Sequence, residues 1–286
     1  MITIRKAYPE DFDAIYPLLS EFNSLYLTKD RWEQLFVDRW NAEEGYFGYV
    51  MMDGDRAVGF LGLIFSKRII KNKVHKFCNM TSWIVKKEYR GRSLFLLLPV
   101  LKLKTYTLTD FTPSREVYAI LKKAGFQEFE THYRLIFPFP NISKLWSNCE
   151  VIFDKNIIEK KLNKKDYQIY RDNQFPHCHH LIIRSKYGEC YLVMGRMVRK
   201  KFPFFIAQIY YINNLDVFRK CIGMIRFEVC FRIKVFAIYI DERFLGKKKI
   251  LFSKKMFLKE PRLYRSDALS KEDMDSLYSE SVIFNI

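Results

Sequence analysis

Apolar and polar residues alternate over the first positions of the chain, and this period of two predicts a β-strand at residues 2–6. Apolar residues at positions 15, 18, 19 and 22 recur at helical spacing, and acidic residues at 10, 11 and 13 suit the first turn of that helix. A second helix is expected at about residues 29–40. The chain therefore begins as a mixture of helices and strands.

Two apolar strands are predicted next, at residues 46–52 and 57–65, on either side of Asp53-Gly54-Asp55. Asp and Gly tolerate the positive φ of a tight turn, so this segment predicts a β-hairpin. The other elements expected in this half are a strand at 76–85, a helix at 94–104 that Pro99 kinks or delays, a strand at 106–109, a helix at 114–123 closed by Gly125, and strands within 126–137.

The pattern breaks at Pro138-Phe139-Pro140-Asn141, and we expect a domain boundary near residue 145, which gives domains 1–145 and 146–286. A charged stretch at 155–166 suits an exposed helix or a linker. The second half then repeats the order of strand, Gly turn, strand, strand, helix and strand. These elements are expected at 179–185, 189–199, 204–211, 215–229 and 235–240. A degenerate duplication explains the repetition.

The net charge of +17 favours anionic partners, although a genome rich in A and T also raises the lysine content without any binding role. The N-terminus lacks the apolar core of a signal peptide, and no apolar run approaches the length of a membrane span, so a cytoplasmic protein is expected. Six cysteines without a C-x-x-C pair indicate neither a zinc site nor a disulfide framework. All six are expected to be reduced thiols, most of them buried.

Residues 83–93, Trp-Ile-Val-Lys-Lys-Glu-Tyr-Arg-Gly-Arg-Ser, resemble the phosphate loop of GNAT N-acyltransferases, in which Arg/Gln-x-x-Gly-x-Gly/Ala links a strand to a helix. Such a loop offers backbone N–H groups at a helix N-terminus to the pyrophosphate of coenzyme A. The resemblance implies that acetyl-CoA or another acyl-CoA is the cosubstrate, held by Trp83, Ile84, Val85, Arg90, Gly91, Arg92 and Ser93. A turn that binds no phosphate is the alternative.

Two positions of this loop depart from the family pattern. Ser93 replaces a usual Gly, and Phe95 replaces a usual Gly or Ala. The side chain of Phe95 either fills the phosphate site or packs into the core. We expect it in the core, because burying a phenylalanine contributes roughly 1.5–3 kcal/mol.

Residues 114–126 resemble the second GNAT signature, Asn-x-x-Ala-x-x-Leu-Tyr-x-x-x-Gly-Phe, when both are aligned on Gly125-Phe126. Ser114 then takes the place of the usual Asn and is a candidate catalytic residue, and Leu121 replaces the tyrosine that commonly protonates the leaving thiolate. Tyr118 lies nearly one helical turn earlier and is the candidate acid, with simple packing as the alternative. Within the strand at 76–85, Asn79 is a candidate for orienting the amine.

The resemblance implies an α/β fold with a mixed sheet, in which a GNAT-like N-terminal domain is followed by a degenerate GNAT-like second lobe that shapes the acceptor cleft. The second half has no phosphate loop, so one CoA is expected. The ending Met274 to Glu280 is similar to that of acyltransferases from bacterial surface-polysaccharide clusters. An amine of a sugar or related metabolite is therefore the expected acceptor.

His177-Cys178-His179-His180 provides metal-ligand chemistry, but in a strand only alternate residues share a face, so no metal is expected. These side chains are alternatively part of the acceptor cleft. Basic tracts at 196–201 and 247–255 are interleaved with phenylalanines. We expect these tracts to form solvent-exposed faces of strands. Nucleic acid is not the expected partner, and peripheral contact with a membrane surface stays open.

Three functions are compatible with these features: an acyl-CoA-dependent N-acyltransferase, a tRNA-dependent aminoacyl transferase supported by the positive charge, and a catalytically silent GNAT-fold protein that binds a partner or membrane surface. We favour the first, because the phosphate loop is the most specific motif of the chain.

Overall fold

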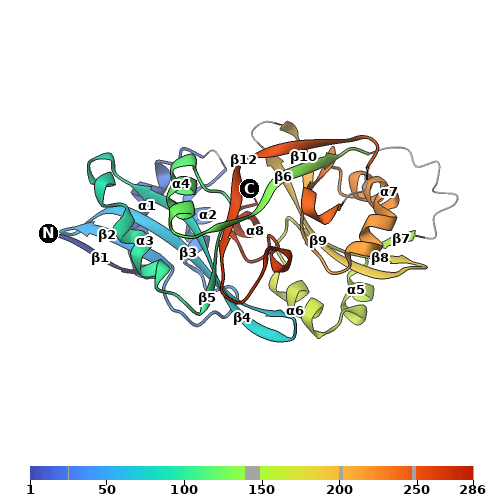
Figure 1. Cartoon of the computed structure of the whole chain (residues 1–286), viewed down its shortest axis with the longest axis horizontal. Helices are drawn as coiled ribbons and strands as arrows, with labels where there is room; N and C mark the ends of the chain where they lie inside the picture. The colour runs from blue at the N-terminus through green and yellow to red at the C-terminus, as the bar shows by residue number, and fades with distance from the viewer. Residues whose placement is uncertain (25, 139–148, 200–201, 247–248, 286) are drawn as a thin grey trace. The chain divides into compact units, whose positions relative to one another are not determined.

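The protein is described here by a computed structural model, which covers residues 1–24, 26–138, 149–199, 202–246 and 249–285 (Figure 1). The chain forms two compact units that are not contiguous in sequence. The first comprises Met1–Phe129, Arg262–Met274 and Tyr278–Phe284, and the second consists mainly of Glu130–Pro261. The boundary expected near residue 145 lies outside the described residues.

The first unit follows the predicted order of elements closely. One helix differs: residues 29–40 form only the short α2 and a 3-10 turn at Gln34–Phe36. The elements are β1 (Ile2–Ala7), α1 (Phe12–Ser20), α2 (Lys29–Glu33), β2 (Gly48–Asp53), β3 (Arg56–Ile70), β4 (Lys73–Val85), α3 (Leu94–Leu101), β5 (Tyr106–Asp110), α4 (Arg115–Lys123), the start of β6 (Gln127–Ile136), the end of β12 (Ser253–Arg265) and α8 (Glu280–Phe284).

Strands β1 to β4 of the first unit are antiparallel neighbours, whereas β4 and β5 are parallel. The predicted hairpin between β2 and β3 turns at Gly54, whose φ is +57°. A second hairpin, between β3 and β4, was not predicted. It turns at Lys71 and Asn72, which both have positive φ, and no glycine marks it in the sequence.

Alternate residues of β3 face two different helix layers. Leu61 and Leu63 belong to the core that also contains Leu96 of α3 and Leu121 of α4. On the opposite face Phe60 stacks on Phe36, beside α2. The strand period of two therefore buries both faces of this sheet, which explains why β3 is almost continuously apolar.

The second unit repeats this arrangement, as the sequence predicted. Its first four strands are antiparallel neighbours, and its fourth and fifth strands are parallel, like β4 and β5. Two strands, β7 and β12, were not predicted. The elements are β7 (Cys149–Ile152), α5 (Lys155–Lys161), α6 (Lys164–Asp172), β8 (Cys178–Ser185), β9 (Gly188–Arg199), β10 (Phe202–Ile212), α7 (Leu215–Arg232), β11 (Ala237–Asp241), the rest of β6 and most of β12.

Each unit contains a strand that lies next to the elements of the other unit in the sequence. In the first unit β5 pairs with the last residues of β12, with Leu263 opposite Asp110. In the second unit β11 pairs with β6, with Ile238 opposite Ile136. The strand that follows α4 thus completes the second unit, and the strand that follows β11 completes the first.

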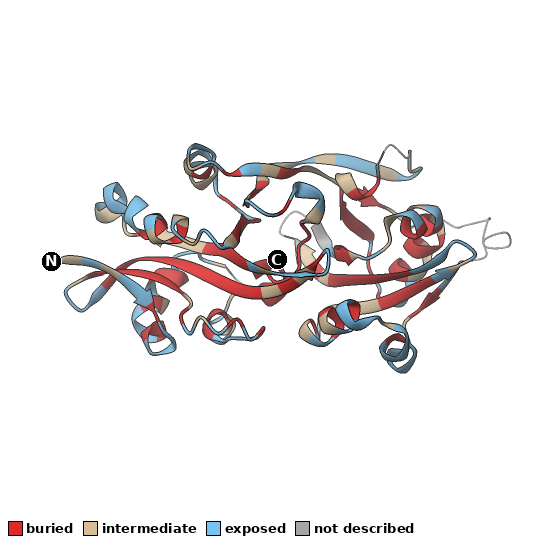
Figure 2. Cartoon of the chain, turned by 60° about the horizontal axis from the view of Figure 1, so that its bottom comes forward, coloured by how far each residue is buried: buried red, intermediate tan, exposed pale blue. Residues whose placement is uncertain are grey.

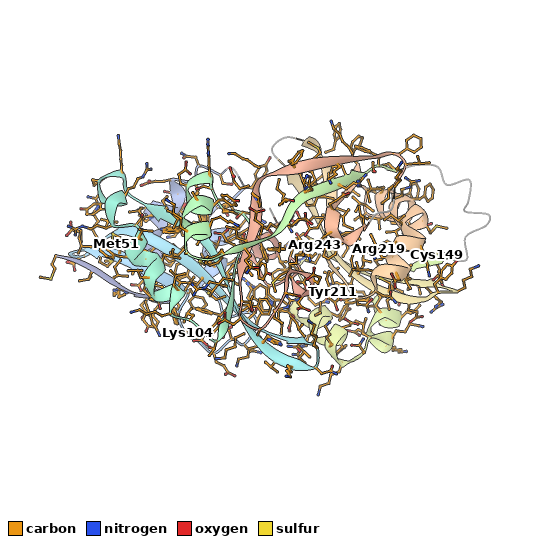
Figure 3. All side chains as sticks on the ribbon, in the orientation of Figure 1. Met51, Lys104, Cys149, Tyr211, Arg219 and Arg243 are labelled. Carbon is orange, nitrogen blue, oxygen red and sulfur yellow. A yellow bond between two sulfur atoms is a disulfide. The ribbon has the colours of Figure 1, made fainter. Side chains whose placement is uncertain are left out.

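The core of the second unit forms between α7 and one face of β7 to β11. Figure 2 shows buried residues running along the strands. Cys149 on β7, labelled in Figure 3, is disulfide-bonded to Cys221 on α7. The expectation of six reduced thiols is therefore wrong for this pair. The two cysteines are 72 positions apart, and only the packing of α7 against β7 brings them together.

The other four cysteines, Cys78, Cys178, Cys190 and Cys230, are free thiols, as predicted. Burial raises the pKa of each thiol, to about 12 for Cys178, Cys190 and Cys230. Buried thiols of raised pKa react slowly with oxidants and alkylating agents, because the thiolate is the nucleophile.

Candidate functional site

Within the described part of the chain, strand β4 has a partner strand on only one side beyond its midpoint. It pairs with β3 along its whole length but with β5 only as far as Asn79, which lies opposite Thr109. Beyond that point a bulge places two residues, Ser82 and Trp83, opposite the single residue Leu61, and Ser82 has a φ of +52°. The second half of β4 therefore borders an opening in the sheet of the first unit.

The loop after β4 forms a 3-10 turn, Lys87–Arg92, that continues into α3. The backbone N–H of Ser93 donates to the carbonyl oxygen of Arg90 over 3.1 Å. Tyr89 anchors the turn, because its hydroxyl donates to the Asp53 carboxylate over 2.8 Å. This hydrogen bond lowers the pKa of Asp53.

A cavity of about 420 Å³ lies between the end of β4, this turn and the start of α4. Five residues predicted to contact CoA line it, namely Trp83, Ile84, Val85, Arg90 and Ser93, together with the predicted catalytic residue Ser114. Gly91 and Arg92 belong to the same turn but are exposed and do not line the cavity. The loop that resembles a phosphate loop thus forms one wall of a cavity.

Helix α4 forms the facing wall. Ser114 is its N-cap residue: the Ser114 hydroxyl oxygen accepts from the N–H of Val117 over 3.3 Å and donates to the Glu116 carboxylate over 2.9 Å. Sequence reasoning missed Glu116, Val117 and Ile120 as lining residues. Val117 and Ile120 follow Ser114 at intervals of three along an amphipathic helix. This spacing places all three on one face of the helix and was the signal that could have identified them.

Tyr118 and Leu121 occupy different surroundings on α4. Leu121 is fully buried in the core, so no hydroxyl stands where the family tyrosine would be. The Tyr118 hydroxyl donates to the Glu128 carboxylate on β6, and Tyr118 does not line the cavity. The structure therefore does not bring Tyr118 together with Ser114 at the cavity, and the acid role of Tyr118 stays a prediction.

Asn79 lies apart from the cavity as well. Its side-chain amide donates to the Thr109 hydroxyl over 3.2 Å, and its carbonyl oxygen accepts from the backbone N–H of Glu280 over 3.3 Å. Asn79 therefore joins β4 to β5 and to α8. Its role in orienting an amine stays a prediction.

Beside Asn79 the first unit buries two acids, Asp110 and Glu280, whose burial the sequence did not predict. The Glu280 carboxylate accepts from the Thr112 hydroxyl over 2.9 Å, and its other oxygen has no hydrogen-bond partner among the described residues. Burial raises the pKa of Glu280 to about 7. Burial and the neighbouring Glu280 also raise the pKa of Asp110 well above its usual value.

The expectation that Phe95 packs into the core is wrong. Its side chain is 52% exposed, and it does not line the cavity either. Helix α3 is apolar on all sides, but only the face with Leu96, Leu97 and Val100 meets the core. Phe95 lies on the other face of the helix. Its side chain therefore does not fill the cavity, even though it is not buried in the core.

The cluster at 177–180 gathers no set of metal ligands. Among the described residues, no group of three or more His, Cys, Asp or Glu side chains is placed to hold a metal ion.

The basic tracts lie partly outside the described residues, at positions 200–201 and 247–248. Within the described part, the Arg196 guanidinium lies 3.4 Å from the centre of the Phe205 ring.

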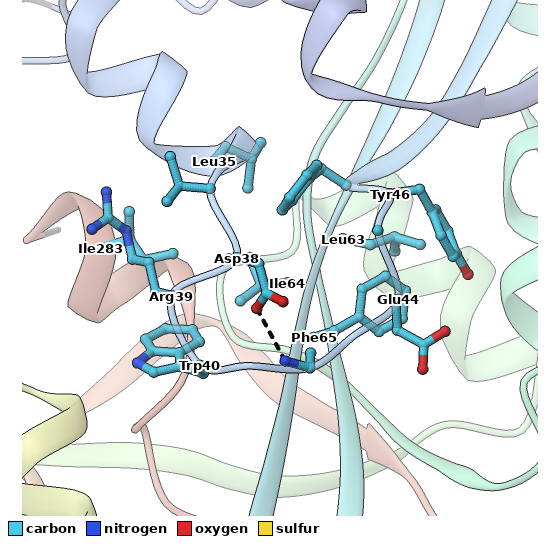
Figure 4. A pocket seen from close by; sticks show the side chains of 14 residues that line it. Leu35, Asp38, Arg39, Trp40, Glu44, Tyr46, Leu63, Ile64, Phe65 and Ile283 are labelled. Carbon is cyan, nitrogen blue, oxygen red and sulfur yellow. Dashed lines mark hydrogen bonds between the residues drawn. The ribbon is translucent and has the colours of Figure 1, made fainter.

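A second pocket of the first unit, between the segment after α2 and β3, is shown in Figure 4. The backbone N–H of Ala42 donates to the Asp38 carboxylate there over 3.0 Å. The free volume is about 20 Å³, which is room for one water molecule and not for a cosubstrate.

In the described parts of the chain, no helix is both long and apolar enough to cross a bilayer.

No protein-family model matches the sequence. No curated protein matches it either. Solved structures do match, at low identity. A GCN5-related N-acetyltransferase from Anabaena variabilis is 12% identical with a TM-score of 0.58, over 92% of this chain and 72% of that one. A probable N-acyltransferase from Enterococcus faecalis is 12% identical with a TM-score of 0.57, over 95% of this chain and 74% of that one.

A glucosamine N-acetyltransferase region within a fungal multi-domain β-N-acetylglucosaminidase is also similar. It is 12% identical with a TM-score of 0.63, over 92% of this chain and 38% of that one. These similarities extend over both units, which agrees with the repeated strand order of the second. The chain therefore has the GNAT fold, that of the GCN5-related N-acetyltransferases.

Proposed function

We propose that this protein is an N-acyltransferase that moves an acyl group, with acetyl as the proposed group, from acyl-CoA to an amine of a sugar or related metabolite. The first domain would bind the acyl-CoA and the second would shape the acceptor cleft. The cavity at the open half of β4 is the observation that carries this proposal. This cavity is lined by Arg90 and Ser93 of the predicted loop and by the end of β4, which among the described residues has no strand partner on one side.

The donor-binding role rests on charge and on backbone geometry. Arg90 provides a guanidinium for the phosphates of CoA, and the turn before α3 provides backbone N–H groups at the start of a helical segment. Glu116 at the opposite wall is negatively charged, and its carboxylate already accepts a hydrogen bond from the Ser114 hydroxyl. The phosphates therefore belong on the Arg90 side of the cavity.

In the proposed reaction the neutral amine attacks the thioester carbonyl carbon, the C–S bond breaks, and CoA leaves as a thiolate. The nitrogen of the tetrahedral intermediate gives up one proton to the solvent as the amide forms, and the leaving thiolate takes up a proton to become the CoA thiol. Holding the two reactants side by side supplies on the order of 7–11 kcal/mol in favourable cases. We propose Tyr118 as the acid, and Ser114 and Asn79 as groups that orient the acceptor.

A sugar amine is proposed as the acceptor. It is supported by the fold similarity to a region described as a glucosamine N-acetyltransferase. A hexosamine panel with acetyl-CoA, followed by detection of free CoA thiol, tests this acceptor class directly.

Calorimetric titration with acetyl-CoA tests the donor site. Arg90→Glu is expected to weaken binding at least about tenfold, because it places a carboxylate beside the phosphates. Lys104→Glu is the control of equal charge change: Lys104 is exposed after α3 and does not line the cavity (Figure 3). Absence of binding by every acyl-CoA tried, or equal affinity of Arg90→Glu and wild type, would contradict the proposal.

A catalytically silent GNAT-fold protein is the second candidate, favoured by the buried Leu121 at the usual acid position. Binding of acetyl-CoA without release of CoA over a broad panel of amines would support it. Turnover with any amine would exclude it.

A further inference from the structure

The second unit contains a separate and larger cavity, of about 530 Å³. It lies between the start of α5, the end of α6, the start of β8 and the end of α7, so all of its lining residues belong to the second unit. Its volume is within the usual range for small-molecule sites. None of the residues named for donor binding, the acid or acceptor orientation in the proposed acyl transfer lines this cavity.

The charged side chains of this cavity are both cationic. Lys155 and Arg232 line it, and none of the other lining residues is an Asp or Glu. The Arg232 Nε donates to the Glu228 carboxylate over 2.9 Å, and no hydrogen bond of the two terminal guanidinium nitrogens is found among the described residues. Lys155 has no ion pair among the described residues. An anionic group is therefore the ligand chemistry that this wall favours.

Aromatic rings form much of the remaining wall. Phe153, Tyr170 and Phe175 line the cavity, and the Phe153 ring lies 5.3 Å from the Arg232 guanidinium carbon. Flat rings beside a cation offer a stacking surface next to a charge. A planar aromatic part in addition to an anionic group is therefore the ligand chemistry that this wall favours.

His180 is a fixed part of the wall. Its Nε2 lies 3.0 Å from the carbonyl oxygen of Asn173 and must donate to it, because a carbonyl has no proton. Burial lowers the pKa of His180 to about 4, so the ring is neutral near pH 7 and its Nδ1, 2.7 Å from the Tyr191 hydroxyl, is the acceptor of that hydrogen bond. His180 is thus a neutral imidazole with both nitrogens occupied.

His179, by contrast, retains hydrogen-bonding capacity. No hydrogen bond of its ring is found among the described residues, and it is partly buried at the cavity. The Gln174 amide nitrogen donates to the carbonyl oxygen of Tyr170 over 2.7 Å, which leaves the amide oxygen of Gln174 as an acceptor. The cavity therefore offers hydrogen bonds to a polar ring as well as cations.

We propose that this cavity binds a nucleoside phosphate, with the phosphate at Lys155 and Arg232 and the base against the aromatic wall. The combination of two cations, aromatic rings and free hydrogen-bonding groups in one cavity carries the assignment. The site goes beyond the proposed acyl transfer and does not depend on it.

Calorimetry on the full chain with uridine diphosphate, uridine and inorganic phosphate tests the proposal. A pyrimidine nucleotide avoids the adenine nucleotide that forms part of CoA. Uridine diphosphate is expected to bind at least about tenfold more tightly than either fragment, and Arg232→Gln and Phe175→Ala are each expected to weaken it about tenfold or more. Arg184→Gln is the control, since Arg184 lies on β8 outside the cavity and pairs with Glu150 and Glu189.

Nuclear magnetic resonance provides a readout that does not depend on the folding of these variants. The chain has five histidines, so the His179 ring signals can be assigned with a His179→Gln variant and should shift on addition of uridine diphosphate. Three outcomes overturn the proposal: no binding at millimolar nucleotide, phosphate binding as tightly as the nucleotide, or binding that Arg90→Glu abolishes. The last result would place the nucleotide in the cavity of the first unit.

Discussion

The Thr112 hydroxyl donates to the Glu280 carboxylate over 2.9 Å, and this contact joins the segment after β5 to α8 inside the first unit. Desolvation outweighs this hydrogen bond, so the pKa of Glu280 is raised to about 7. The folded protein therefore holds this proton more tightly than the unfolded chain does.

The sign of the resulting pH dependence follows from linkage. Stability from Glu280 is fully present below its unfolded pKa of about 4.5 and is lost as pH rises through about 7, a change of about 3 kcal/mol. The raised pKa of Asp110 acts in the same direction. Urea denaturation between pH 5 and 8 should show falling stability in the wild type and a flatter profile in Glu280→Gln. Equal slopes would contradict this assignment.

His180 should give the opposite dependence in the second unit. Burial lowers its pKa to about 4, so its contribution is present above the unfolded pKa of about 6.5 and is lost as pH falls toward 4. We expect His180→Gln to lose less stability than its parent between pH 7 and 5. The comparison is best made in a Glu280→Gln background, where the opposing contribution is removed. An identical loss in both proteins would argue against a neutral, buried imidazole.

The Cys149–Cys221 disulfide should contribute to the stability of the second unit. It closes a long loop, a 72-residue separation, and the chain-entropy argument gives about 4 kcal/mol for a loop of this size. Without reductant, thiol titration of the denatured protein should find the four free cysteines and not all six. Cys149→Ala/Cys221→Ala should lower the urea midpoint. Six titratable thiols in unreduced protein would rule the bond out.

Tyr118→Phe tests the proposed acid. If the hydroxyl protonates the leaving thiolate, kcat should fall at least about tenfold while the acetyl-CoA affinity stays constant. The control is Glu128→Gln, which changes the partner of the Tyr118 hydroxyl and keeps the phenol. Unchanged turnover in Tyr118→Phe would limit the residue to its hydrogen bond with Glu128.

The sequence predicted the features that depend on local patterns. The Gly54 hairpin, the helix over residues 114–123 and its end at Gly125 all follow from residues that are close together in the chain. The loop around Arg90 was located for the same reason, since its strand, turn and helix are consecutive. The repeated order of the second half was also visible from periodicity alone.

Features that depend on distant contacts were not predictable. Phe95 and Leu96 are neighbours in an apolar helix, and only the position of the core decides which one is buried. Glu280 is an ordinary acidic residue in the sequence, and it becomes a buried carboxyl only beside Thr112. Cys149 and Cys221 likewise meet through the packing of α7, which no spacing rule shows.

The origin of the edge strands has a consequence for synthesis on the ribosome. The β5 edge of the first unit is covered by Leu263 and its neighbours in β12, which are translated long after β5 itself. Until those residues leave the exit tunnel, β5 presents an open edge to other nascent chains. Slow translation between β11 and β12 should therefore lengthen the period in which the newborn chain depends on chaperones.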